Sequence, residues 1–219
     1  KSINMSGVNS INWARIIAQT VYYFYSYFKL GKENISFSVP TGNFGDVYAG
    51  YLAKKIGLPI NKFIVATNQN DILHRAITNG SYNVENVLET ISPSMDIQIA
   101  SNFERLIFDL NDQSDKKTIE VMKSIKEKGK YAIQKESLDK INVDFLSSRM
   151  DENEILDTIK AVYKQFDKVL DPHSAIGYGA FDKVNLNGNN VVLATAHPCK
   201  FPDAIKKAIN IKAELPDEL

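Results

Sequence analysis

The sequence predicts an α/β fold in which helices pack on a mostly parallel sheet. Apolar runs of strand length alternate with amphipathic segments of helix length, an order typical of parallel strands covered by helices. The chain has 219 residues, 44% of them hydrophobic, which is enough to bury a full core. No internal repeat and no Ser/Gly/Pro-rich linker divides it. We therefore expect a globular protein with one or two domains.

The first third of the chain gives the clearest elements. A long, almost uncharged helix is predicted over residues 11–30, with Ser10 or Asn9 as its N-cap and Gly31 as its stop. The elements expected next are a strand at 35–39, a helix at 43–56 stopped by "GLP", a strand at 62–67 and a short helix at 70–77. This strand-helix-strand-helix order is the basis of the predicted parallel sheet.

The middle of the chain differs from both ends. Amphipathic helices with charged outer faces are predicted at 115–129 and 151–170, with no strand of comparable strength between them. We expect a mainly helical peripheral region at about 84–170. A third apolar strand at 189–198 and a helix at 201–209 then return to the alternating pattern.

Composition narrows the classes of function. The 26 basic residues are interspersed with 26 acidic ones, so no broad field of one sign attracts nucleic acid or an anionic bilayer. The single cysteine cannot form an internal disulfide, and the sequence shows neither a secretory leader nor a membrane-length apolar span. We expect a cytoplasmic protein without nucleic-acid or membrane partners.

The turn "TGNFGD" at 41–46 has the composition of a phosphate site. Gly42 and Gly45 let the main chain approach a ligand closely, and the turn ends at a helix N-terminus, whose free N–H groups and dipole attract phosphate. A plain strand-to-helix turn capped by Asn43 or Asp46 is an equally good interpretation of the pattern alone. The motifs GxxxxGK[ST] and GxGxxG are both absent, which disfavours nucleotide binding.

Arg15 is the only charged residue between Lys1 and Lys29. Asn12 and Gln19 share its helical face in a segment that is otherwise apolar and aromatic. A guanidinium desolvated there needs an anion, either a carboxylate elsewhere or an anionic substrate. A structural ion pair or a snorkelling arginine is the simpler alternative.

The far strand places polar residues at the presumed carboxyl edge of the sheet, where ligands of open α/β sheets bind; these are Thr195, His197 and Lys200. A nucleophilic pair of His197 and Cys199 is disfavoured because no third residue orients it. Three scattered histidines and one cysteine show no zinc-ligand spacing, so no metal site is predicted. At 171–174 the residues are those of a capped helix start, and capping alone would account for them.

Six segments together resemble, in order, segments of the threonine synthases, which are PLP-dependent enzymes of fold type II, in the branch found in yeast and many bacteria. They are "NSINWARIIAQTVYYF", "VPTGNFGDVYAGYLAKKIGLPI", "ATNQNDILHR", "SNFERLIFDL", "DPHSAIG" and "TAHPCKFPDAI". The resemblance covers nearly the whole chain. It implies a tryptophan synthase β-like fold and a carbon–oxygen lyase acting on phosphate.

The resemblance also implies a cofactor site for pyridoxal 5'-phosphate. The turn would hold the cofactor's phosphate, and Thr195 would meet its pyridine nitrogen. The turn residues concerned are Thr41, Gly42, Asn43, Phe44, Gly45 and Asp46. The family converts O-phospho-L-homoserine and water to L-threonine and phosphate. Within that reaction our hypothesis is that Arg15, with Asn12 and Ser10, recognises the substrate's phosphate.

One family element is absent from the sequence. The Schiff-base lysine of the family lies in an N-terminal Ser-Phe-Lys-Asp-like segment that these 219 residues lack, and Lys200 corresponds to a different family lysine. Residues 1–219 thus resemble the C-terminal portion of the PLP-binding large domain, with the N-terminal half of the same chain as a missing partner. Alone it should hold no catalytic residue, should be inactive and should expose apolar surface.

Two alternatives remain open from the sequence. The chain could be a non-catalytic phosphate- or cofactor-binding module of the same fold. It could also be another fold type II PLP lyase, such as a threonine dehydratase or a cysteine synthase, although the segments "SINWAR" and "SNFERL" are unlike those enzymes. The sequence predicts neither the oligomeric state nor regulation.

Overall fold

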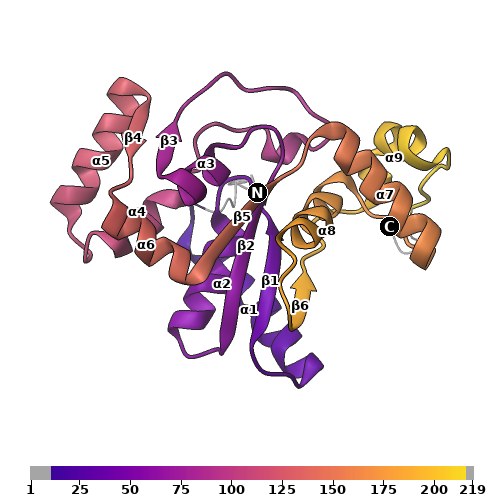
Figure 1. Ribbon diagram of the computed structural model, residues 1–219, viewed down its shortest axis with the longest axis horizontal. Coiled ribbons are helices and arrows are strands. Elements are labelled where there is room, and N and C mark those ends of the chain that lie inside the picture. The colour runs from indigo at the N-terminus through magenta and orange to yellow at the C-terminus, as the bar shows by residue number, and fades with distance from the viewer. Residues whose placement is uncertain (1–10, 216–219) are drawn as a thin grey trace, which may run out of the picture.

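A four-stranded parallel sheet forms the centre of the computed structural model, which describes residues 11–215 (Figure 1). The strand order is β5–β2–β1–β6, and each neighbouring pair is parallel. The strands are β1 (Ile35–Pro40), β2 (Ile60–Thr67), β5 (Phe145–Arg149) and β6 (Asn189–Val192). The predicted α/β class with a mostly parallel sheet is confirmed.

The two faces of the sheet bury alternate residues of its strands. In β2, Phe63 and Val65 join one hydrophobic cluster while Ile64 and Ala66 join another, as the period of two requires. Helices α1 (Trp13–Leu30) and α2 (Gly45–Lys55) cover the first face. Helix α8 (Pro172–Val184) covers the second, with α7 (Glu152–Phe166) and α9 (Pro202–Ile209) packed beside it, on the right in Figure 1.

The middle of the chain supplies one strand that the sequence analysis missed. The expectation of no comparable strand there was wrong, because β5 follows α6 (Lys135–Asp144) directly and pairs with β2, placing Phe145 beside Phe63. The letters "FLSSR" carry little strand signal, and pairing with a buried neighbour decides their conformation. The other elements of this region are α3 (Ile72–Asn79), α4 (Phe103–Leu110), α5 (Asp115–Lys128) and the antiparallel pair β3 (Ser81–Asn83) and β4 (Lys130–Ala132).

Helix α1 begins slightly later than predicted. Asn12 is the N-cap, accepting a hydrogen bond from the Ala14 amide at 2.9 Å, whereas the predicted caps Ser10 and Asn9 lie outside the described residues. Gly31 ends the helix at φ 57°, as predicted. The buried residues of α1 form one narrow stripe, Ile16, Thr20 and Tyr23.

The rest of α1 exposes large apolar side chains. Val21 is 59% exposed and Phe28 is 72% exposed, and Trp13, Ile17, Tyr22 and Tyr25 are exposed as well. An exposed apolar surface was expected from the resemblance, and this face of α1 is one.

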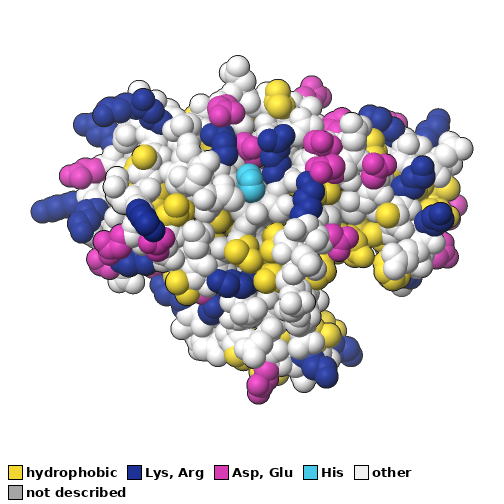
Figure 2. Space-filling model, viewed as in Figure 1, with side chains coloured by type: hydrophobic (Ala, Val, Ile, Leu, Met, Phe, Trp, Pro, Cys, Tyr) yellow, Lys and Arg dark blue, Asp and Glu magenta, His cyan; other side chains and the backbone are white. Residues whose placement is uncertain are grey.

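On the side of the molecule drawn in Figure 2, acidic and basic side chains are interspersed, and hydrophobic side chains border the hollow beside β6. Within residues 11–215, every helix falls short of the length and apolarity that a bilayer crossing requires.

Candidate cofactor site

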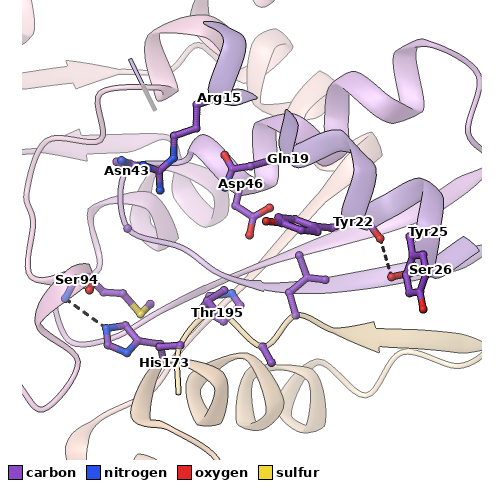
Figure 3. Close-up of a pocket in the computed structure, with 16 residues that line it drawn as sticks. Arg15, Gln19, Tyr22, Tyr25, Ser26, Asn43, Asp46, Ser94, His173 and Thr195 are labelled. Atoms are coloured by element: carbon purple, nitrogen blue, oxygen red, sulfur yellow. Dashed lines mark hydrogen bonds between the residues drawn. The ribbon is translucent and has the colours of Figure 1, made fainter. Parts of the chain in front are cut away.

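A cavity of about 590 Å³ lies at the carboxyl ends of β1 and β6 (Figure 3). Its walls come from segments far apart in the sequence: α1, the turn after β1, the loop at 94–95, the start of α8 and the loop after β6. Carboxyl ends of parallel strands meet at one edge of a sheet, which is where ligands of such folds bind. Among the side chains and main-chain segments that line it are Arg15, Gly42, Asn43, Asp46, His173 and Thr195.

The turn after β1 has a backbone shape that its residues dictate. A Cβ atom on Gly42 would lie 2.6 Å from the Ser94 carbonyl oxygen, so only glycine permits this close approach of two main chains. Phe44 has φ 69°, and its fully buried ring packs edge-on against Phe103 and also contacts Phe145. The buried ring thus anchors the left-handed residue that precedes α2.

Helix α2 starts at Gly45 with its N-terminus at the cavity. The first N–H groups of a helix have no intrahelical acceptor, and the helix dipole makes this end electropositive. Asn43 Oδ1 accepts a hydrogen bond from the Gly45 amide at 3.1 Å, and Asn43 itself is exposed and lines the cavity. The helix N-cap is Phe44, which makes no side-chain cap bond, so Asn43 stabilises the turn and does not cap α2. The turn presents to the cavity a helix end, a feature that generally attracts anions.

The six predicted turn residues do not all reach the cavity. Gly42, Asn43 and Asp46 line it. Thr41 is buried, and its hydroxyl donates to the Val39 carbonyl at 2.6 Å. The Phe44 side chain points into the core, and Gly45 is buried. A ligand contact by Thr41, Phe44 or Gly45 would therefore be made by the main chain.

Asp46, in the first turn of α2, is held by a tyrosine of α1. The Tyr23 hydroxyl lies 2.8 Å from the Asp46 carbonyl oxygen and 3.1 Å from its Oδ1. Burial raises the pKa of Asp46 to about 6, against the opposing effect of the Tyr23 hydrogen bond. Burial also raises the pKa of Tyr23 well above its usual value, and the neighbouring carboxylate adds to this effect.

A buried network at the start of α8 fixes two other walls of the cavity. Asp171 Oδ1 lies 3.1 Å from His173 Nδ1, and Oδ2 accepts a hydrogen bond from the Ser174 hydroxyl. His173 Nε2 accepts the Ser94 amide at 3.3 Å, drawn as a dashed line in Figure 3, so Nδ1 carries the ring proton toward Asp171. The Ser174 hydroxyl in turn accepts the Thr195 amide at 3.2 Å.

This network orients main chain and performs no proton transfer in the arrangement seen. The Ser94 amide already donates to the acceptor nitrogen of His173. The carbonyl group of the same residue, Ser94, faces Gly42. Burial by itself raises the pKa of Asp171, but hydrogen bonds from His173 and Ser174 outweigh it and lower that pKa below its usual value. Only a helix cap was predicted at this position. The signal for the network is an acid, a histidine and a hydroxyl residue within one capped turn.

Of the residues predicted at the carboxyl edge, only Thr195 lies at the cavity. It is exposed and follows the end of β6 by three residues. His197 instead caps the short 3₁₀ turn at Pro198–Lys200, where its Nδ1 accepts the Cys199 amide at 3.3 Å and lies 2.9 Å from Cys199 Sγ. Lys200 is exposed in that turn and does not line the cavity.

Arg15 extends from α1 toward Asn43 at the rim of the cavity (Figure 3). Its side chain is exposed, so the expectation of a desolvated guanidinium was wrong: residues 11–15 lie where α1 is not yet packed on the core. Asn12 uses its side chain to cap α1, and Ser10 lies outside the described residues. The structure thus brings Arg15, the 41–46 turn and Thr195 to one cavity.

The fold and the cavity define a class of protein. Solved structures of PLP-dependent fold type II enzymes share this architecture, among them the processed form of threonine deaminase isoform 2 from Solanum lycopersicum (TM-score 0.53, 13% identity, 90% of this chain and 50% of that one). At that identity the match shows the fold alone. The chain has the fold of the type II PLP-dependent enzymes.

The more similar proteins are threonine synthases. The family model "Threonine synthase, C-terminal" matches residues 174–219. The threonine synthase of Pseudomonas aeruginosa is 45% identical over 212 residues, which cover 95% of this chain and 45% of the relative. The structure titled PLP-bound threonine synthase from Brucella melitensis matches with a TM-score of 0.94 and 48% identity, covering 98% of this chain and 47% of that one. Over nearly all of its length the chain is similar to threonine synthases, and it spans about half the length of the relatives it matches.

Proposed function

We propose that the full-length protein containing this chain is a PLP-dependent threonine synthase, which converts O-phospho-L-homoserine and water to L-threonine and phosphate. The observation that carries the proposal is one cavity lined by Arg15, by Gly42 and Asn43, and by Thr195. The similarity of the chain to threonine synthases over nearly all of its length supports the same conclusion.

The residues present fit the cofactor. A helix N-terminus and a glycine turn offer amide donors for the phosphate of PLP, and the Thr195 hydroxyl suits a hydrogen bond to a pyridine nitrogen. The cavity volume of about 590 Å³ lies in the range of small-molecule sites, about 300–1,000 Å³. When bound, PLP supplies the electron sink for the reaction. Thr41, Phe44 and Gly45 shape the turn, and any contact they make with the phosphate comes from their main chain.

Arg15 is proposed to bind the phosphate of the substrate. It lies at the rim of the cavity beside Asn43, and a planar guanidinium matches the oxygens of a phosphate group. Asn12 and Ser10 remain predicted contacts. The cap that Asn12 makes on α1 places Arg15 at the first turn of that helix.

The rest of the full-length protein is proposed to complete the site. No lysine lines the described part of the cavity, so the lysine that holds PLP is expected outside this chain. The exposed face of α1 and the free side of β6, at the edge of the described sheet, are surfaces against which that part would pack. A cytoplasmic location stays a prediction, supported by the single cysteine.

The alternative is a non-catalytic module of the same fold. The test is to saturate the full-length protein with PLP, follow the cofactor's absorbance, and measure threonine and phosphate formed from O-phospho-L-homoserine. Equal yields of both products support the proposal. PLP binding without phosphate release identifies the module, and release of a different amino-acid product identifies another lyase.

A further inference from the structure

The N-terminus of helix α4 contacts the 41–46 turn. The Asn102 amide donates a hydrogen bond to the Asn43 carbonyl at 3.0 Å, and the Phe103 ring packs edge-on against Phe44 at 5.2 Å between centroids. Any shift in the start of α4 is therefore transmitted to the residues that face the cavity.

One side chain of α4 joins this contact to the start of α1. Arg105 Nε donates to Asn102 Oδ1 at 3.0 Å, and Nη2 donates to the Ile11 carbonyl at 2.8 Å. The guanidinium also lies over the Trp13 ring, 5.0 Å from its centroid. A planar cation with several fixed donors can make all three contacts at once.

The start of α1 has one other aromatic contact, between Trp13 and Tyr48 at 6.4 Å between ring centroids. Residues 11–15 are all exposed, and the buried stripe of the helix begins only at Ile16. Segments with few buried contacts open at low cost. Arg15 belongs to this first turn, so its direction depends on what holds Ile11 and Trp13.

We propose that Arg105 is a positioning residue that holds the start of α1 against α4 and so aims Arg15 at the phosphate of the substrate. The inference rests on the proposed function, because it concerns the same anion site. Lysine cannot replace Arg105, because a single ammonium group lacks the fork that reaches Asn102 and Ile11 together.

The test uses inorganic phosphate titrated calorimetrically into the full-length, PLP-saturated protein. Arg105→Lys and Arg105→Gln should each weaken phosphate binding at least fivefold, and should raise KM for O-phospho-L-homoserine similarly while kcat changes less than threefold. Arg75→Lys is the matched control. Arg75 lies on α3, away from the cavity, and its guanidinium donates to Asp71, to the Asn83 carbonyl and to Gln98. This variant should lower the thermal midpoint without changing phosphate affinity.

A second arm asks whether Arg105 acts through Arg15. In an Arg15→Ala background, Arg105→Gln should produce no further loss of phosphate affinity. An equal loss in both backgrounds, or an equal loss in Arg75→Lys, overturns the proposal. Should the Arg105 variants not fold, Trp13→Leu decides, with an expected loss of at least twofold; wild-type affinity in that variant overturns the proposal.

The two levels of failure are distinguishable. If Arg15→Ala leaves phosphate affinity and KM unchanged, the substrate role of Arg15 in the proposed function is wrong. If Arg15→Ala weakens phosphate binding while both Arg105 variants bind it normally, only the positioning role is wrong.

Discussion

Tyr23 of α1 and Asp46 of α2 are joined by a hydrogen bond of 3.1 Å between the phenol and the carboxyl group, beside the cavity. Because burial raises the pKa of Asp46 to about 6 from 3.8, its charged form is disfavoured in the folded protein. The contribution of Asp46 to the stability of the fold should therefore be complete below about pH 4. That contribution should be lost as the pH rises through about 6.

Asp46→Asn should remove this pH dependence. One pKa unit corresponds to about 1.4 kcal/mol, so the variant should be more stable than wild type at pH 8 by about 2 kcal/mol once partial exposure is allowed for, with no gain at pH 4. The free energy of unfolding of the full-length apoprotein, measured in urea at both pH values, gives the answer. A gain of the same size at pH 4 would show that charge is not the cause.

Asp171→Asn should destabilise the protein in the opposite pH range. The lowered pKa of Asp171 means that its contribution is present above its unfolded value and is lost as the pH falls through the folded value. Replacing the buried acceptor of His173 and Ser174 should cost about 3 kcal/mol at pH 7 and less near pH 3. Asp151→Asn, at the cap of α7, is the control and should cost under about 0.5 kcal/mol. Urea unfolding curves of both variants at the two pH values test this.

Gly42→Ala should weaken PLP binding. The added Cβ would meet the Ser94 carbonyl oxygen at 2.6 Å, and because the main chain fixes the position of both atoms, the turn must move. We expect at least a tenfold rise in the PLP dissociation constant, measured by titrating the apoprotein. Gly31→Asn, with φ 57° and open space around it, should bind PLP normally. Normal binding by Gly42→Ala would mean that the turn does not hold the phosphate.

Removing the Thr195 hydroxyl should lower activity without changing the stability of the protein. Thr195→Val keeps the shape but removes the hydroxyl, so we expect kcat to fall tenfold or more with a shifted absorbance of bound PLP, while Thr195→Ser retains most activity. Thr195 is exposed, so the thermal midpoint should stay within about 1 °C of wild type. Unchanged kcat and absorbance in Thr195→Val would contradict a contact with the cofactor ring.

The apolar face of α1 should be buried in the full-length protein. Val21→Lys would then place a charge in an interface and lower the free energy of unfolding by about 2 kcal/mol. Ile119→Lys on α5 is matched in exposure, 63% against 59% for Val21, and should change stability by under about 0.5 kcal/mol. Equal, small effects in urea unfolding of the two full-length variants would show that the α1 face remains open.

Elements with strong local signals were predictable from the sequence. Gly31 ends α1, and Asp171 caps α8 as its residue type indicates. Strand β5 was missed because pairing with β2, and not its own residues, fixes its conformation. The local residue pattern of a strand carries no information on which distant segment of the chain pairs with it.

The site was predictable in part for the same reason. The composition of the 41–46 turn indicated an anion-binding helix end, which lines the cavity through Gly42, Asn43 and Asp46. The burial of Arg15 was predicted wrongly, because a helical period gives the face of a residue but not how far the helix extends beyond the core. The links from Asp171 to Ser94 and Thr195, and from Arg105 to Ile11, join segments that only tertiary structure brings together.

The order in which the cavity walls are synthesised limits when the cofactor can be retained. Arg15 and the turn leave the ribosome before Thr195 and the loop after β6, which follow roughly ten seconds or more later at about 5–20 residues per second. Until that loop docks, a nascent chain presents the helix end without the wall that Thr195 and its neighbours supply. Retention of the proposed vitamin-derived group therefore has to wait until residue 195 has been made, and a polypeptide interrupted before that residue should emerge without it.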